Sequence, residues 1–223
     1  MRVSPVAHWY DNVDEMLDAA AATARPSHNH DEGIKGAQTV ALAIFKALSY
    51  HRYQEAPKHI DEILNECVQF SGYDINMPKA SVLNRFDETC QGTVPVALKI
   101  ISIATDFQDA VRLAVSLGAD ADTLGAIVGS IAEAIWGIPM VIRHQIEEYI
   151  PEEMQFIVNE FHRARPYSFK PLIDTTFYKK DYSEAAWDML DNKERKELME
   201  IVDKEKDEKR ELMKERGKAR EQW

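Results

Sequence analysis

Two carboxylates and a hydroxyl stand close together in residues 118–125, and these residue types in this spacing could bind a cation. Asp120 and Asp122 lie two positions apart in a predicted tight turn, and Thr123 follows directly. Oxygen donors of this kind suit Mg²⁺, Mn²⁺ or Ca²⁺ better than zinc. Two or three ligands are too few to hold a metal, so the others would come from elsewhere in the fold, from water or from a substrate.

The same residues allow a structural interpretation. Asp122 or Thr123 could cap the helix that follows, while Asp120 gains from the positive end of the helix dipole. An EF-hand loop is excluded, because Leu124 and Ile131 stand where that loop needs oxygen donors. The turn is surrounded by more small residues than a cap needs, which would let a ligand approach closely. They are Gly118, Ala119, Ala121, Gly125, Ala126, Gly129 and Ser130.

A second candidate group is a pair of histidines, His28 and His30, in a polar loop predicted over residues 27–33. Two imidazoles could bind a transition metal. However, no third ligand has suitable spacing, and exposure to solvent is the more typical state of loop histidines.

The elements that position these residues are predicted to be helices. Asn12 and Glu15 form a capping-box pattern that opens a helix, and Pro26 is expected to stop it. Apolar residues at helical spacing then predict a helix over residues 34–50. Because no convincing alternation typical of strands occurs anywhere, we expect an all-α, multi-helix bundle.

Helical spacing also marks a stretch from Ile60 to Val68 and another that begins at Val94. Between them, residues 71–92 carry turn residues without a sustained period. Long loops of this kind in compact domains are often functional. Thr105 with Gln108 predicts the cap of the next helix.

The last predicted helix with a strong apolar face runs from Leu124 to Trp136 and ends at Gly137. Pro139 and Pro151 separate two shorter helices after it. We divide the chain into an all-α domain over residues 1–165 and an extension over residues 166–223, a charged helical tail.

Composition limits the function classes. The chain has 223 residues, is 45% hydrophobic and carries a net charge of −11. The acidic balance argues against a nucleic-acid binder and against a polybasic membrane-surface protein. Two cysteines, Cys67 and Cys90, cannot make a disulfide scaffold or a closed thiolate zinc site. Since residues 1–12 have no apolar signal region and the apolar stretch 124–142 contains a charge, glycines and a proline, we predict a cytoplasmic protein with no membrane span.

Three stretches resemble the ADP-ribosylglycohydrolase family, which includes the dinitrogenase-reductase-activating glycohydrolase. AVSLGADADTLGAIVGSIAEAIWGIP closely resembles the family's acidic signature, with Ala119 where a second glycine is usual. SHNHDEGIKGA is similar to its histidine-containing loop and the helix after it. FDETCQGTVPVALKIISIATDFQDAVRLAV is similar to its bacterial members. The resemblance extends in order from about Met1 to Pro151.

The resemblance implies an all-α fold that binds two Mg²⁺, or Mn²⁺, in a cleft between helices. Asp120, Asp122 and Thr123 would supply one set of metal ligands, and His28 would contact ADP-ribose. The implied function is Mg-dependent hydrolysis of the glycosidic bond between ADP-ribose and a modified protein side chain. The partner would be an ADP-ribosylated protein or another ligand that contains ADP-ribose.

Several family features have no match in this sequence. These are a second acidic motif of the Thr-Asp-Asp type, a catalytic glutamate and a glycine-rich phosphate loop. Asp87 and Thr89 do not reproduce the acidic pattern, and Asp31 with Glu32 comes in the wrong order along the chain. We therefore expect the C-terminal part of the domain, truncated at its N-terminus, with the catalytic residues outside it.

Two alternatives remain open at this level. The chain could be a non-catalytic module that binds ADP-ribose or another protein. It could also be half of a split enzyme, completed by an N-terminal polypeptide.

Overall fold

The computed structural model describes residues 1–51, 55–164, 211, 214–220 and 223. Within these ranges the chain is helical and contains no strand, which confirms the prediction of an all-α fold. The chain divides into two units, Met1–Pro171 with Trp223 and Leu172–Gln222, and the helices discussed below belong to the first. Most of the predicted charged tail lies outside the described residues, and residue 211 and residues 214–220 within it are helical.

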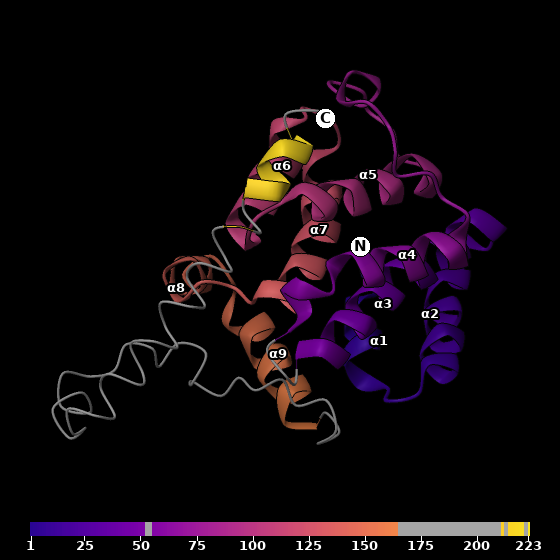
Figure 1. Cartoon of the computed structure of the whole chain (residues 1–223). Helices are drawn as coiled ribbons and strands as arrows, with labels where there is room; N and C mark the ends of the chain where they lie inside the picture. The colour runs from indigo at the N-terminus through magenta and orange to yellow at the C-terminus, as the bar shows by residue number, and fades with distance from the viewer. Residues whose placement is uncertain (52–54, 165–210, 212–213, 221–222) are drawn as a thin grey trace, which may run out of the picture. The chain divides into compact units, whose positions relative to one another are not determined.

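Nine α-helices and two short 3₁₀ turns make up the described part of the first unit (Figure 1). Their bounds are α1 Ser4–Trp9, α2 Val13–His28, α3 Asp31–His51, a 3₁₀ turn at Ala56–Lys58, α4 Ile60–Ser71, a second at Lys79–Ser81, α5 Cys90–Ile103, α6 Phe107–Ser116, α7 Ala121–Trp136, α8 Met140–Glu147 and α9 Glu152–Ala164. None of the described helices is long and apolar enough to cross a membrane.

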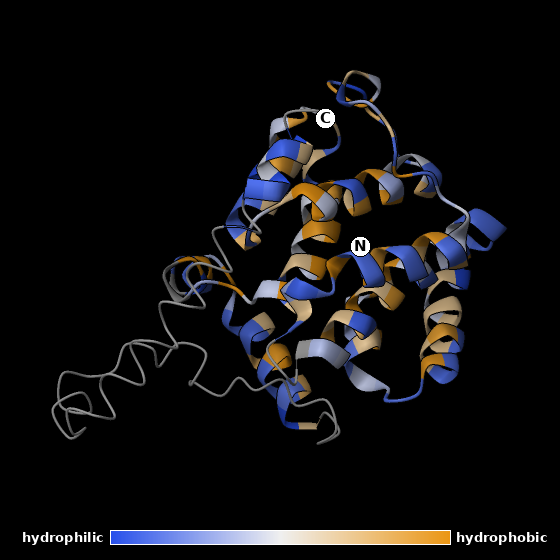
Figure 2. Cartoon of the chain, viewed as in Figure 1, coloured by the Kyte–Doolittle hydropathy of each residue, from blue (hydrophilic) through white to orange (hydrophobic). Residues whose placement is uncertain are grey.

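Helices α3 and α7 form the centre of the unit. Helix α7 packs against α3, α5 and α6, while α3 also packs against α1, α2 and α4. The apolar sides of these helices face inward and their polar sides face outward (Figure 2).

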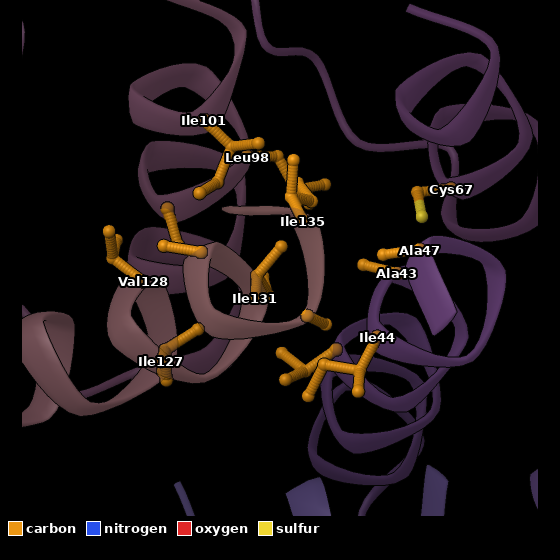
Figure 3. Packing of buried hydrophobic residues seen from close by; sticks show 14 of the residues in the cluster. Ala43, Ile44, Ala47, Cys67, Leu98, Ile101, Ile127, Val128, Ile131 and Ile135 are labelled. Carbon is orange, nitrogen blue, oxygen red and sulfur yellow. The ribbon is translucent and has the colours of Figure 1, made fainter. Parts of the chain in front are cut away.

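The buried face of α7 follows from its sequence. Ile127, Val128, Ile131 and Ile135 recur at the three- and four-residue steps of a helix, and each is at most 5% exposed. They meet side chains of α5 and α3, including Leu98 and Ile44 (Figure 3). This packing holds α7 firmly, so the residues at its N-terminus are carried on a rigid element.

One predicted helix end is wrong. Pro26 lies inside α2, which continues to His28. Proline removes the hydrogen bond to the carbonyl of Ala22, but Ala22 is exposed, so water can satisfy that carbonyl. As a result, the predicted loop over residues 27–33 is reduced to Asn29 and His30 between α2 and α3.

Three helix starts also differ, because α3, α5 and α7 begin at Asp31, Cys90 and Ala121, three to four residues before their predicted starts. The Asn12 side chain accepts hydrogen bonds from the backbone of Asp14 and Glu15, which confirms the predicted cap of α2. The cap of α6 is one residue later than predicted, because Asp106 rather than Thr105 accepts a backbone hydrogen bond. The long loop predicted between helices is present and separates α4 from α5.

Candidate ligand and metal site at the start of α7

Asp120 and Asp122 approach each other in the first turn of α7. Asp120 stands at the N-cap position, but its side chain makes no capping hydrogen bond. The Asp122 carboxylate accepts a hydrogen bond from the backbone N–H of Thr123, with 2.8 Å between N and Oδ1. A hydrogen bond with the Asp120 side chain, followed by that backbone bond, holds the pKa of Asp122 below its ordinary value. The structural interpretation that Asp122 or Thr123 caps the helix is wrong, because both residues lie inside α7.

A cavity of about 390 Å³ opens beside this turn. Its walls are the loop between α4 and α5, the first turns of α5, and the turn into α7. Asp120 lines it, and so do Asp74 and Asp87 of the loop. A volume of this size falls within the range of small-molecule sites in proteins.

The turn before α7 is held in place from the loop side. The backbone N–H of Asn84 donates to the carbonyl of Leu117, at 2.7 Å between N and O. Gly118 has φ +63°, and a Cβ atom there would lie 2.3 Å from Asn84 Oδ1. Because Asn84 also has a positive φ of 54°, both sides of this contact have tightly specified backbones. The contact links the loop, and with it one wall of the cavity, to the turn that carries Asp120.

Asp87 anchors the other end of the loop to α5. Its Oδ1 accepts hydrogen bonds from the backbone N–H and the hydroxyl of Thr89, at 2.9 and 2.6 Å. Thr89 in turn caps α5 by accepting from the backbone N–H of Gly92. A Cβ atom at Gly92 would lie 2.1 Å from Asp87 Oδ2, so only glycine leaves room for this carboxylate. The hydrogen bonds from Thr89 lower the pKa of Asp87.

The lowered pKa of Asp87 predicts how its contribution to stability depends on pH. A carboxyl with a depressed pKa in the folded state stabilises the fold above its ordinary pKa of 3.8, and that contribution is lost as the pH falls through the lowered pKa. We expect Asp87→Ala to cost about 1 kcal/mol at neutral pH, at the low end for charged hydrogen bonds because the carboxylate still contacts solvent. Urea unfolding at about pH 7 and at about pH 2.5 measures the cost at each pH.

The control variant is Asp87→Asn, which keeps an acceptor but cannot titrate. The difference in stability between Asp87→Asn and wild type should shrink on acidification. A cost of either substitution that is equal at both pH values would contradict the role assigned to the ionised carboxylate.

His28 is the last residue of α2, and its side chain is exposed. Its Nδ1 is 2.8 Å from the hydroxyl of Ser27. His28 is not among the residues that line the cavity. A nearby residue of the chain, Glu32, is linked to the cavity wall by a hydrogen bond. Four residues further along the chain, in the first turn of α3, Glu32 accepts a hydrogen bond from the hydroxyl of Tyr73 at 3.2 Å. Tyr73 lines the cavity. The contact of His28 with ADP-ribose stays a prediction.

The donor chemistry at the start of α7 fits a hard cation, but only as part of a site. Two neighbouring carboxylates repel each other when both are ionised, and a cation between them relieves that repulsion. Among the described residues, no group of three or more His, Cys, Asp or Glu side chains is arranged to hold a metal. Asp120, Asp122 and Thr123 therefore need further ligands from outside this group.

Sequence reasoning missed Asp74 and Arg85 as cavity-lining residues. The available signal was the long loop between two strongly periodic helices. That signal identifies a segment, whereas the residues that face the cavity depend on how the loop folds back onto the turn before α7.

The family model for ADP-ribosylglycohydrolase matches residues 1–168. The chain belongs to the ADP-ribosylglycohydrolase family. This match confirms the resemblance and agrees with the all-α fold. The expectation that the chain is only the C-terminal part of the family's domain is not borne out, because the match begins at residue 1.

A curated relative of this ADP-ribosylglycohydrolase-family chain is the uncharacterized protein YegU of Escherichia coli (strain K12). The two are 26% identical over 167 residues, which cover 62% of this chain and 49% of YegU. The chain thus spans about half the length of this relative. A comparison with solved structures finds no match.

Proposed function

We propose that this chain forms the ligand cavity and one set of metal ligands of an ADP-ribosylglycohydrolase, which hydrolyses the glycosidic bond between ADP-ribose and a modified protein side chain. The observation that carries the proposal is the position of Asp120, which lines a cavity of about 390 Å³ and stands next to Asp122 and Thr123 at the start of a rigid helix. Membership of the family supplies the reaction class. A cytoplasmic location is part of the proposal.

The cofactor in this proposal is Mg²⁺, with Mn²⁺ as a substitute and two ions in the intact site. Asp120, Asp122 and Thr123 would hold one of them through oxygen atoms, which is the ligand type that these ions prefer. When bound, such ions would supply Lewis-acid activation of the ribose and of an attacking water. The chain's own residues orient the ligand: the loop anchored by Asn84 and Asp87 forms one wall of the cavity, and the turn into α7 forms another.

Turnover is proposed to need a second polypeptide. Within the described residues, the pair at the start of α7 has no third carboxylate, histidine or cysteine arranged to complete a metal site. The family's second acidic motif and catalytic glutamate would come from that complementing polypeptide. A second candidate function is a module that binds ADP-ribose or a protein without catalysis. The incomplete set of metal ligands among the described residues favours it as well.

The test is calorimetric titration of the full chain with ADP-ribose, with and without Mg²⁺, followed by an assay for ADP-ribose release from an ADP-ribosylated protein. We expect Mg²⁺-dependent binding and weak or no release by the chain alone. Release after mixing with a separate polypeptide that carries the family's second acidic motif and catalytic glutamate would support a split enzyme. Binding without release in the mixture would support a non-catalytic module.

Two outcomes would overturn the proposal. Absence of ADP-ribose binding at millimolar concentration, with and without Mg²⁺, contradicts the proposed ligand. Robust release by the purified chain alone contradicts the need for a second polypeptide.

A further inference from the structure

Acidic side chains outnumber basic ones among the described residues that line the cavity. Asp74, Asp87 and Asp120 are acidic, and among the described lining residues Arg85 is the one basic side chain. Three carboxylates repel an anionic ligand because the charges have the same sign, and ionised carboxylates cannot donate a hydrogen bond to it. A ligand that carries phosphate groups therefore needs a cationic partner on the cavity wall, and Arg85 is in position to supply it.

The Arg85 guanidinium is available for a ligand. In the described part of the chain, its side chain forms neither a hydrogen bond nor an ion pair. Hydrogen bonds from Thr89 dominate the lowering of the pKa of Asp87, and attraction from Arg85 contributes least. The Arg85 guanidinium is thus not bound by the Asp87 carboxylate.

The backbone that carries Arg85 is anchored on both sides. On one side, the N–H of Asn84 bonds to the carbonyl of Leu117 at 2.7 Å. On the other side, the Asp87 carboxylate is held by Thr89. A cation on an anchored segment loses less conformational freedom on binding than one on a free loop, and this favours affinity.

We infer that Arg85 is the anion-binding residue of the cavity and that it contacts the diphosphate of the ligand. The inference rests on the proposed function, since it assigns the phosphate groups of ADP-ribose to this side chain. The planar guanidinium presents donors in a fork that matches two phosphate oxygens, which a lysine ammonium cannot reproduce. Arg85 would thereby make the cavity selective for diphosphate-bearing ligands over uncharged sugars.

The test compares wild type with Arg85→Gln and Arg85→Lys, titrated with ADP-ribose and with inorganic diphosphate. All titrations are run both with Mg²⁺ and with a chelator, which separates the contribution of Arg85 from that of a cation. The matched control is Arg112→Gln, which removes the same charge from an exposed position on α6 away from the cavity. Melting temperature is recorded for every variant.

We expect Arg85→Gln to weaken binding of both ligands by about 10- to 100-fold, the usual effect of losing charge-assisted hydrogen bonds. Arg85→Lys should retain part of the affinity, and Arg112→Gln should bind like wild type. The melting temperatures should stay nearly equal, because the Arg85 side chain makes no hydrogen bond or ion pair in the described fold and attracts Asp87 only weakly.

The outcomes separate this inference from the proposed function. ADP-ribose binding that is unchanged in Arg85→Gln overturns the inference and leaves the function standing. Binding of diphosphate through Arg85 without any binding of ADP-ribose supports the anion site and contradicts the function. If wild type binds neither ligand, both are wrong. Equal losses in Arg85→Gln and Arg85→Lys with lowered melting temperatures assign a structural role and also overturn the inference.

Discussion

Replacing Asp120 and Asp122 together by alanine is expected to abolish Mg²⁺-dependent binding of ADP-ribose. The change removes two of the three oxygen donors at the start of α7, and Thr123 alone cannot hold a divalent cation. Loss of groups that merely orient metal ligands costs about 10- to 100-fold in affinity, so loss of two ligands should cost at least about 100-fold. Calorimetric titration with Mg²⁺, and with ADP-ribose in the presence of Mg²⁺, measures the effect.

The same double variant should fold almost as well as wild type. Asp120 makes no capping hydrogen bond, so its removal costs its interaction with the helix dipole, about 0.3–1 kcal/mol, and its exposed hydrogen bond with Asp122. Removing Asp122 gives up the hydrogen bond from the backbone N–H of Thr123, which costs little because the Asp122 side chain is exposed. A large loss of binding together with a small change in urea stability is therefore the signature of ligands rather than of a cap.

The matched control for the double variant removes two exposed carboxylates elsewhere, Asp11→Ala with Asp18→Ala. Both variants change the net charge by the same amount, so a nonspecific electrostatic effect would appear in both. If the control weakens Mg²⁺ binding as much as the variant at the start of α7, the metal-ligand assignment is wrong.

Apolar periodicity predicts the helices well where they carry a buried face. Helix α7 is expected to begin at Leu124 but begins at Ala121, because its first turn contains small and polar residues without an apolar position. Pro26 was expected to end α2, and the prediction was wrong because the lost hydrogen bond falls on an exposed side of the helix. Both differences concern helix ends, where local solvation and capping decide and periodicity carries no signal.

The sequence predicts one side of the candidate site and leaves the other side undetermined. The acidic residues at 120 and 122 stand out by their spacing within one short run. The opposite wall depends on contacts between distant residues, such as the hydrogen bond from Asn84 to Leu117, which no local pattern encodes. Arg85 enters the site only because that contact brings the loop to the turn before α7.

Gly118→Ala is expected to produce the largest loss of stability among single substitutions in this region. The left-handed backbone at Gly118, with φ +63°, costs a residue with a Cβ atom about 1–2 kcal/mol. The new Cβ atom would also lie 2.3 Å from Asn84 Oδ1, so the Asn84 side chain must move. We expect a total loss of about 2–3 kcal/mol in urea unfolding, together with weaker ADP-ribose binding, because the turn and the loop both border the cavity.

Gly125→Ala is the matched control, because it makes the same change seven residues later in the same motif. Its Cβ atom would meet nothing within 4 Å, and Gly125 lies inside α7. Alanine there should stabilise the helix by about 0.5–1 kcal/mol. Adding Asn84→Gly to Gly118→Ala should restore the part of the loss that comes from the clash and leave the part that comes from φ. Equal stability of Gly118→Ala and Gly125→Ala would contradict the contact between loop and turn, and with it the coupling of the cavity wall to the residues at 120 and 122.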